Sequence, residues 1–254
     1  MDTVLDALDA RAAATPERLA FVVGVETVTF GALATDSRRL AGRLGTLGVR
    51  PGDRVALLLG SSAGFLRALF ALQRLRATPV AVHAGLPAEA VGRRVALIRA
   101  ALALVPEGWA DAPAGPAPRL GWRPLSALPE GELAVTTRPG PEDVAYLQLT
   151  SGTTAASKAA VVSHRSLAAS LAASVSFLEA DADDVFVSWM PLHHDLGLVR
   201  FGPRRWCWSS RRRPTSRRAL RTGRRWRRRS PARCAPRWAS PRGRCASPHR
   251  GPSR

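Results

Sequence analysis

The sequence has no cysteine in its first 199 residues, and it contains a single lysine in 254. The three cysteines, Cys207, Cys234 and Cys245, are irregularly spaced near the C-terminus, so neither a disulfide framework nor a zinc cluster is expected. No run of apolar residues is long enough for a membrane span. Residues 1–15 are acidic and amphipathic, unlike a secretory signal. These absences favour a cytoplasmic protein.

Residues 200–254 contain no acidic side chain and no Val, Ile, Lys, Asn, Gln, Met or Tyr, but they hold 20 arginines and four of the seven tryptophans. The first 199 residues carry 18 basic and 19 acidic groups, a net charge of −1, so the arginines of 200–254 account for the chain's formal charge of +19. Such a composition buries too little apolar surface to offset chain entropy, which predicts a disordered tail. Its residues have G- and C-rich codons, and we interpret it as an out-of-frame translation. A genuine Arg/Pro-rich tail is the alternative.

Residues 1–199 alternate between two periodicities. Apolar runs that predict strands occur at 19–23, 25–30, 54–59, 78–82, 144–149, 159–162 and 184–189. Helical spacing occurs at 4–15, 30–47, 63–76, 86–103 and 163–178. The Pro/Gly/Ala-rich stretch 106–141 predicts a loop or linker that contains a little structure, or a subdomain boundary. The alternation indicates an α/β fold with mixed, largely parallel sheets and flanking helices.

A loop of small hydroxyl residues follows the predicted strand 144–149 and ends at the only lysine. Its members are Thr150, Ser151, Gly152, Thr153, Thr154 and Lys158. Backbone N–H groups and hydroxyls in such a loop can surround phosphate oxygens, and Lys158 would add a positive charge. The loop does not match the Walker pattern. A polar turn between two strands is the alternative interpretation.

A second polar cluster, His193, His194 and Asp195, follows the predicted strand 184–189. Loops at strand ends are usual places for binding groups in α/β proteins. A metal site is not expected, because neighbouring side chains diverge and a third, separated ligand is missing.

The two clusters together resemble the adenylate-forming (AMP-binding) superfamily, which includes acyl-CoA synthetases and fatty acyl-AMP ligases. The family loop reads Thr-Ser-Gly-Ser/Thr-Thr-Gly-x-Pro-Lys-Gly, and 150–154 with Lys158 match it, whereas Ala155, Ser157 and Ala159 depart from it. The segment Ser-Trp-Met-Pro-Leu-His-His-Asp-Leu-Gly-Leu at 188–198 is most similar to the fatty acyl-AMP ligase branch. The resemblance covers 1–199, a partial AMP-binding domain, and 200–254 match nothing in the family.

The resemblance implies an enzyme that converts a fatty or other carboxylic acid to acyl-AMP with ATP and Mg²⁺. It implies that Lys158 and His194 are catalytic, that the loop residues Thr150, Ser151, Gly152, Thr153 and Thr154 bind the nucleotide with Lys158, and that coenzyme A or an acyl carrier protein accepts the acyl group. His193 is assigned a structural role. Family segments that complete the nucleotide site have no match after 199, so this chain alone is expected to be inactive.

Two other functions stay open on the sequence alone. The Arg- and Trp-rich segment 200–254 could bind nucleic acid through charge and stacking, although non-specific binding to polyanions is expected of it in any case. Residues 1–199 could also keep the fold as a catalytically inactive interaction partner.

Overall fold

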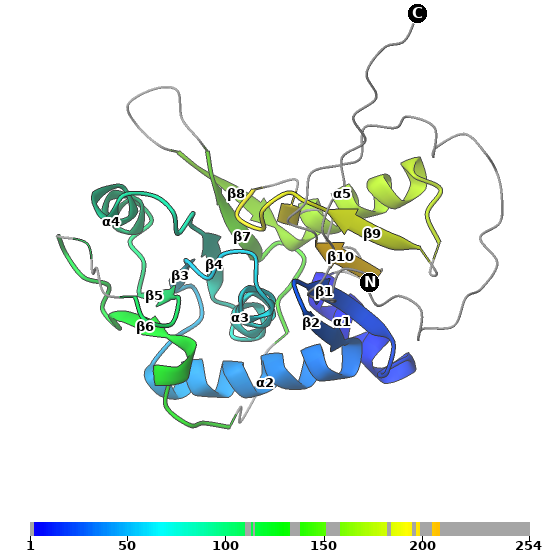
Figure 1. Cartoon of the computed structure of the whole chain (residues 1–254), viewed down its shortest axis with the longest axis horizontal. Helices are drawn as coiled ribbons and strands as arrows, with labels where there is room; N and C mark the ends of the chain where they lie inside the picture. Colours follow the sequence, from blue (N-terminus) through cyan, green and yellow to red (C-terminus); the bar gives the residue numbers. More distant parts are fainter. Residues whose placement is uncertain are drawn as a thin grey trace, which may run out of the picture. The chain divides into compact units, whose positions relative to one another are not determined.

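The computed structural model describes residues 3–109, 113, 115–132, 138–150, 158–181, 184–194, 197–198 and, for the backbone alone, 205–208. All of them belong to one structural unit, residues 1–212. Its elements form two sheets with flanking helices (Figure 1).

The chain begins with helix α1 (Val4–Ala14) and the antiparallel strands β1 (Leu19–Val23) and β2 (Glu26–Thr29). A capping box starts α1: the Thr3 hydroxyl accepts from the Asp6 N–H, and the Asp6 carboxylate accepts from the Thr3 N–H. Gly24, with φ of 62°, makes the turn between the strands, because a left-handed conformation is easiest for glycine. These elements confirm the local predictions for 4–30.

Helix α2 (Phe30–Leu47) follows at once. Thr29 caps its N-terminus, and Gly48 ends it in a left-handed conformation with φ of 102°. The buried face carries Leu33, Leu40 and Leu44, as the helical spacing predicts.

The larger sheet has the strand order β6-β5-β3-β4-β7-β8. Its strands are β3 (Arg54–Leu57), β4 (Thr78–Ala81), β5 (Leu102–Val105), β6 (Trp122–Pro124), β7 (Val144–Leu149) and β8 (Ala159–Ser163). All neighbouring pairs are parallel except β7 with β8, so the predicted fold class is confirmed. The helices α3 (Ala63–Arg74), α4 (Ala88–Leu97) and α5 (His164–Phe177) connect strands or follow them.

Two sequence predictions that concern the larger sheet differ from the structure. The helix expected at 86–103 is wrong at its C-terminal end, because α4 stops at Leu97 and Leu102–Val105 is the buried strand β5. Arg99, with φ of 49°, breaks the helix, and alternate residues of β5 then face opposite sides of the sheet. The stretch expected to be a loop or linker at 106–141 contributes β6 to the sheet and a short 3-10 helix, η1 (Leu125–Ala127).

The smaller sheet has the order β2-β1-β10-β9, with β9 at Val185–Ser188 and β10 at Arg205–Trp208. Strand β10 is parallel to both neighbours, β1 and β9. It lies within the segment that the sequence predicts to be disordered, so at these four residues the structure differs from that expectation. The rest of 200–254 lies outside the described residues.

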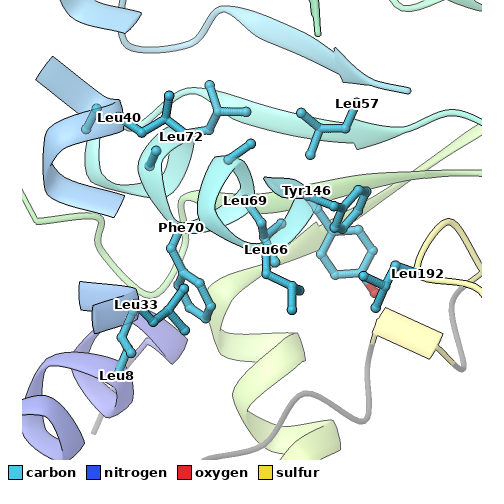
Figure 2. Packing of buried hydrophobic residues seen from close by; sticks show 14 of the residues in the cluster. Leu8, Leu33, Leu40, Leu57, Leu66, Leu69, Phe70, Leu72, Tyr146 and Leu192 are labelled. Carbon is cyan, nitrogen blue, oxygen red and sulfur yellow. The ribbon is translucent and has the colours of Figure 1, made fainter. Parts of the chain in front are cut away.

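The core has two parts, one on each face of the larger sheet. Leu57, Leu102 and Leu104 pack into the larger cluster with α1, α2 and α3, whereas Ala56, Val80 and Ala103 pack against α4 on the other face. Figure 2 shows Phe70 of α3 against Leu33 and Leu8, and Leu66 near Tyr146 and Leu192. Strands covered on both faces explain their nearly unbroken apolar sequences.

Candidate functional site

The candidate site lies at the edge of the larger sheet where the parallel strands β3, β4 and β7 end. Ser61 follows β3, His83 follows β4, and Gln148 is the penultimate residue of β7. The segment after β9, which carries His193 and His194, reaches the same edge through hydrogen bonds to Ser61 and Gln148. Ligands of α/β proteins bind at this carboxyl edge of the strands.

The proposed phosphate loop is closed at its base. The backbone N–H and the hydroxyl of Thr150 both donate to the Lys158 carbonyl oxygen, at 2.9 and 3.2 Å. The adjacent pair, Leu149 and Ala159, is the last pair of the antiparallel ladder between β7 and β8. Both ends of the loop are therefore fixed side by side. Ser151, Gly152, Thr153 and Thr154, like the departures Ala155 and Ser157, lie outside the described residues.

Lys158 is exposed and forms no ion pair within the described part of the chain. An exposed ammonium group can bind an anion such as a nucleotide phosphate. The residues present at the loop base fit a phosphate group: a loop rich in hydroxyl residues by sequence follows strand β7, and an exposed cation that has no counter-ion among the described residues ends it.

A tight turn after β9 presents the two histidines. The His194 N–H donates to the Pro191 carbonyl oxygen at 3.0 Å. The N–H of the fully buried Leu192 donates to the Ser61 hydroxyl at 3.0 Å, and the Gln148 carboxamide donates to the His193 carbonyl oxygen at 3.1 Å. These bonds attach the turn to the ends of β3 and β7.

The His193 ring packs edge-on against His83, with ring centroids 4.3 Å apart and planes inclined at 69°. Burial, together with the neighbouring His83 and His194, lowers the pKa of His193 from 6.5 to about 4. His193 is therefore neutral near pH 7. The sequence analysis assigned it a structural role, and that assignment stays a prediction.

Sequence reasoning missed Ser61, His83 and Gln148. The available signal was topological, because each lies near the carboxyl end of a predicted parallel strand, where binding groups gather. None of them stands in a recognisable motif, so only the strand order brings them to His193.

Two further findings concern the described residues. They contain no cluster of three His, Cys, Asp or Glu side chains with the geometry of a metal site. In the same ranges no helix has the length and hydropathy needed to cross a membrane.

A largely parallel α/β sheet brings the base of the Thr150–Lys158 loop and the histidine turn to one carboxyl edge, where α/β proteins bind their ligands. The AMP-binding enzyme family model matches residues 8–203. The chain therefore belongs to the AMP-binding, adenylate-forming family.

Known proteins similar to this chain include two curated ligases. It is 31% identical over 198 residues to the 2-succinylbenzoate–CoA ligase of Geobacillus kaustophilus, covering 78% of this chain and 40% of the relative. It is 30% identical over 188 residues to a long-chain-fatty-acid–AMP ligase of Mycolicibacterium smegmatis, covering 68% of this chain and 29% of the relative. The chain thus spans well under half the length of these relatives.

Solved structures of similar fold include two ligases. A fatty acyl-adenylate ligase from work on the E. coli and L. pneumophila enzymes matches with a TM-score of 0.71 and 28% identity, over 82% of this chain and 40% of that one. The o-succinylbenzoate coenzyme A synthetase of Bacillus subtilis, in complex with ATP and magnesium, matches in fold with a TM-score of 0.74 at 24% identity, over 82% of this chain and 45% of that one.

Proposed function

We propose that this chain is part of an enzyme that uses ATP to activate a carboxylic acid to acyl-AMP, and that the acid is a fatty acid. The observation that carries the proposal is the meeting of two separate segments at one sheet edge. The Thr150–Lys158 loop base and the His193–His194 turn are both bonded to the end of β7. Family membership and the similarity to fatty acyl-AMP ligases support the choice of reaction and acid.

In this proposal each residue has a distinct part. The ammonium of Lys158 attracts the outer phosphates of ATP, and the hydroxyl and N–H groups of 150–154 surround them. Bound ATP would supply the α-phosphate: as the acid's carboxylate oxygen bonds to it, its bond to pyrophosphate would break, which gives acyl-AMP and pyrophosphate, and Mg²⁺ would offset the phosphate charge. His194 lies beside the acid's carboxylate, and His193 fixes the turn that presents it.

The proposal extends to the acyl acceptor, which is coenzyme A or an acyl carrier protein, and to the activity of the chain by itself. Because the chain covers only 29% of the similar fatty-acid–AMP ligase, we propose that it does not complete the reaction alone. Purified full-length chain should show no fatty-acid-dependent exchange of pyrophosphate into ATP. A measurable exchange rate that disappears in Lys158→Met would refute this part.

The phosphate role can be tested without catalysis. We expect magnesium pyrophosphate, titrated at about 150 mM salt, to shift the amide NMR signals of Thr150 and Ala159 saturably. Lys158→Met should weaken binding about tenfold or more, because it removes the charge at the loop base. The matched control is Arg93→Met, which removes one exposed cation from α4. Equal weakening by both variants would show only general attraction to a basic protein.

The acyl-activation role is tested first on the coding DNA and then on the protein that its corrected reading frame encodes. Sequencing around codon 200 and translating all three frames should reveal a frame that continues with strand and helix patterns. Protein made from that frame should exchange pyrophosphate in the presence of a fatty acid, and His194→Ala should lower kcat. Stop codons in every other frame would instead make the basic tail genuine.

The composition of 200–254 supports one second candidate, nucleic-acid binding. Twenty arginines in 55 residues bind polyanions through counterion release, which weakens steeply with salt. We expect binding to DNA or RNA that vanishes at moderate salt. Sequence-selective binding that survives such salt would favour this function over acyl activation.

A further inference from the structure

One side chain joins the two segments of the candidate site. The carboxamide nitrogen of Gln148 donates to the His193 carbonyl oxygen at 3.1 Å and to the Leu149 carbonyl oxygen at 3.3 Å. Leu149 is the last residue of β7 and directly precedes Thr150, where the proposed phosphate loop begins. The same amino group therefore contacts both the histidine turn and the base of the loop.

The alternation of strand β7 directs this side chain toward the turn. Alternate residues of a strand share a face, so Gln148 lies on the same face as Tyr146 and Thr150. Tyr146 belongs to the larger hydrophobic cluster together with Leu192 of the turn (Figure 2). Leu147 packs into the smaller cluster on the opposite face. The carboxamide therefore leaves the sheet on the side that the turn covers.

Burial alone would favour an apolar residue at this position. The Oε1 atom of Gln148 is buried and accepts no hydrogen bond in the described structure. An unpaired buried acceptor is unfavourable because it has lost its bonds to water. Methionine has a similar length and avoids this loss. What glutamine adds here is the amide donor, and the two carbonyl oxygens that it meets fix which end of the carboxamide faces them.

The other attachments of the turn come from neighbouring strands. Ser61, after β3, accepts from the Leu192 N–H at 3.0 Å, and His83, after β4, packs on the His193 ring. Strands β3, β4 and β7 are adjacent in the sheet. Ser61 and His83 thus hold the turn to the sheet. Gln148 differs from them because the phosphate loop begins two residues later on its own strand.

We propose that Gln148 is a positioning residue that sets the distance between the histidine turn and the phosphate loop. This inference rests on the proposed acyl activation, in which the loop holds the phosphates of ATP and His194 lies beside the acid's carboxylate. The reacting atoms of such a step must lie about 3–3.5 Å apart, and a misplacement of about 1 Å can slow it about 100-fold. Gln148 acts through the backbone of His193 and Leu149, and it is not a catalytic residue.

Titration of the full-length chain with magnesium pyrophosphate, followed by amide NMR, tests whether Gln148 couples the two segments. In the wild type we expect the signals of Ala159, at the loop base, and His194, at the turn, to shift with one Kd. Gln148→Met keeps the length of the side chain but removes the donor. It should shrink the pyrophosphate-induced shift of His194 about threefold or more, while the Kd measured at Ala159 stays within about twofold.

Gln73→Met is the matched control. Gln73 is also buried, donates to a backbone carbonyl oxygen of β7, that of Ala145 at 3.3 Å, and has an unpaired Oε1. Ala145 is the second residue of β7, far from the end where the loop begins. Gln73→Met should therefore leave the shifts of Ala159 and His194 as they are in the wild type.

Three results would overturn the inference. If pyrophosphate shifts Ala159 but the His194 shift is absent in the wild type or undiminished in Gln148→Met, Gln148 does not couple the segments, and the proposed function stands. If Ala159 shows no saturable shift in the wild type, the phosphate role fails and the positioning role fails with it. Equal losses in Gln148→Met and Gln73→Met show a general loosening of β7. If Gln148→Met does not fold, Gln148→Asn holds the carboxamide one methylene farther from the turn and should shrink the His194 shift in the same direction.

Discussion

The neutral His193 should make the stability of this fold depend on pH in a way that one substitution removes. In the unfolded chain its pKa is near 6.5, and in the folded chain it is about 4. Between these values the unfolded state binds more protons, so stability rises with pH and falls as pH drops below about 6.5. The pKa difference of about 2.5 between the two states corresponds to about 3 kcal/mol of folding free energy. Because the ring is half-buried, solvent screening reduces this to about 1.5 kcal/mol.

His193→Phe isolates this contribution, because phenylalanine keeps a ring against His83 and cannot bind a proton. Urea unfolding at about pH 7.5 and pH 5 gives the free energy of unfolding of both proteins. Between these pH values we expect the wild type to lose about 1 kcal/mol more than the variant, since part of the shift lies below pH 5. His164 contributes in the same direction to both proteins and cancels in the difference. An equal loss in the two proteins would falsify the inference that the surroundings of His193 hold it neutral.

Three further predictions concern interactions between distant segments. Asp9→Ala should cost about 3–4 kcal/mol in urea unfolding, because it leaves Arg74, whose side chain is 3% exposed, without its carboxylate at 2.6 Å. Arg74→Met should cost less, since Asp9 is more exposed, and the opposite order of the two losses would contradict the argument. Ser61→Ala should cost about 1–2 kcal/mol and speed amide exchange at Leu192, whose N–H loses its acceptor, whereas an unchanged exchange rate would show that the bond does not hold the turn. Lys158→Met should change the free energy of unfolding by less than about 0.5 kcal/mol, because the side chain is exposed and surface substitutions have small effects; a larger loss in the same assay would assign it a structural role.

Most helices and strands could be predicted from sequence because their signals are local. The side chains of Thr3 and Asp6 mark the start of α1, and Gly48, which has no side chain, marks the end of α2. Leu102–Val105 shows the limit of this approach. Its apolar run continues the helical spacing of α4, and only pairing with Val55–Leu57 of β3 makes it a strand. Short apolar runs do not distinguish helix from strand without knowledge of their neighbours.

The residues of the candidate site also separate into those with a local sequence pattern and those without one. The loop from Thr150 to Lys158 and the pair His193–His194 could be selected from sequence, because each is a contiguous pattern of chemically suited residues. Ser61 and His83 could not, because single serines and histidines are common and carry no pattern. The Ser61 bond to Leu192 joins residues 131 positions apart.

The sequence by itself determined the family, the alternation of strands and helices, and the two segments that resemble a nucleotide- and acid-binding site. The tertiary structure alone decided which strands are neighbours, that β5 is a strand, and that His83 packs on His193. The physical reason is that capping, turns and periodicity depend on residues within a few positions. Burial, strand order and the pairing of buried polar atoms depend on segments that meet only when the chain has folded.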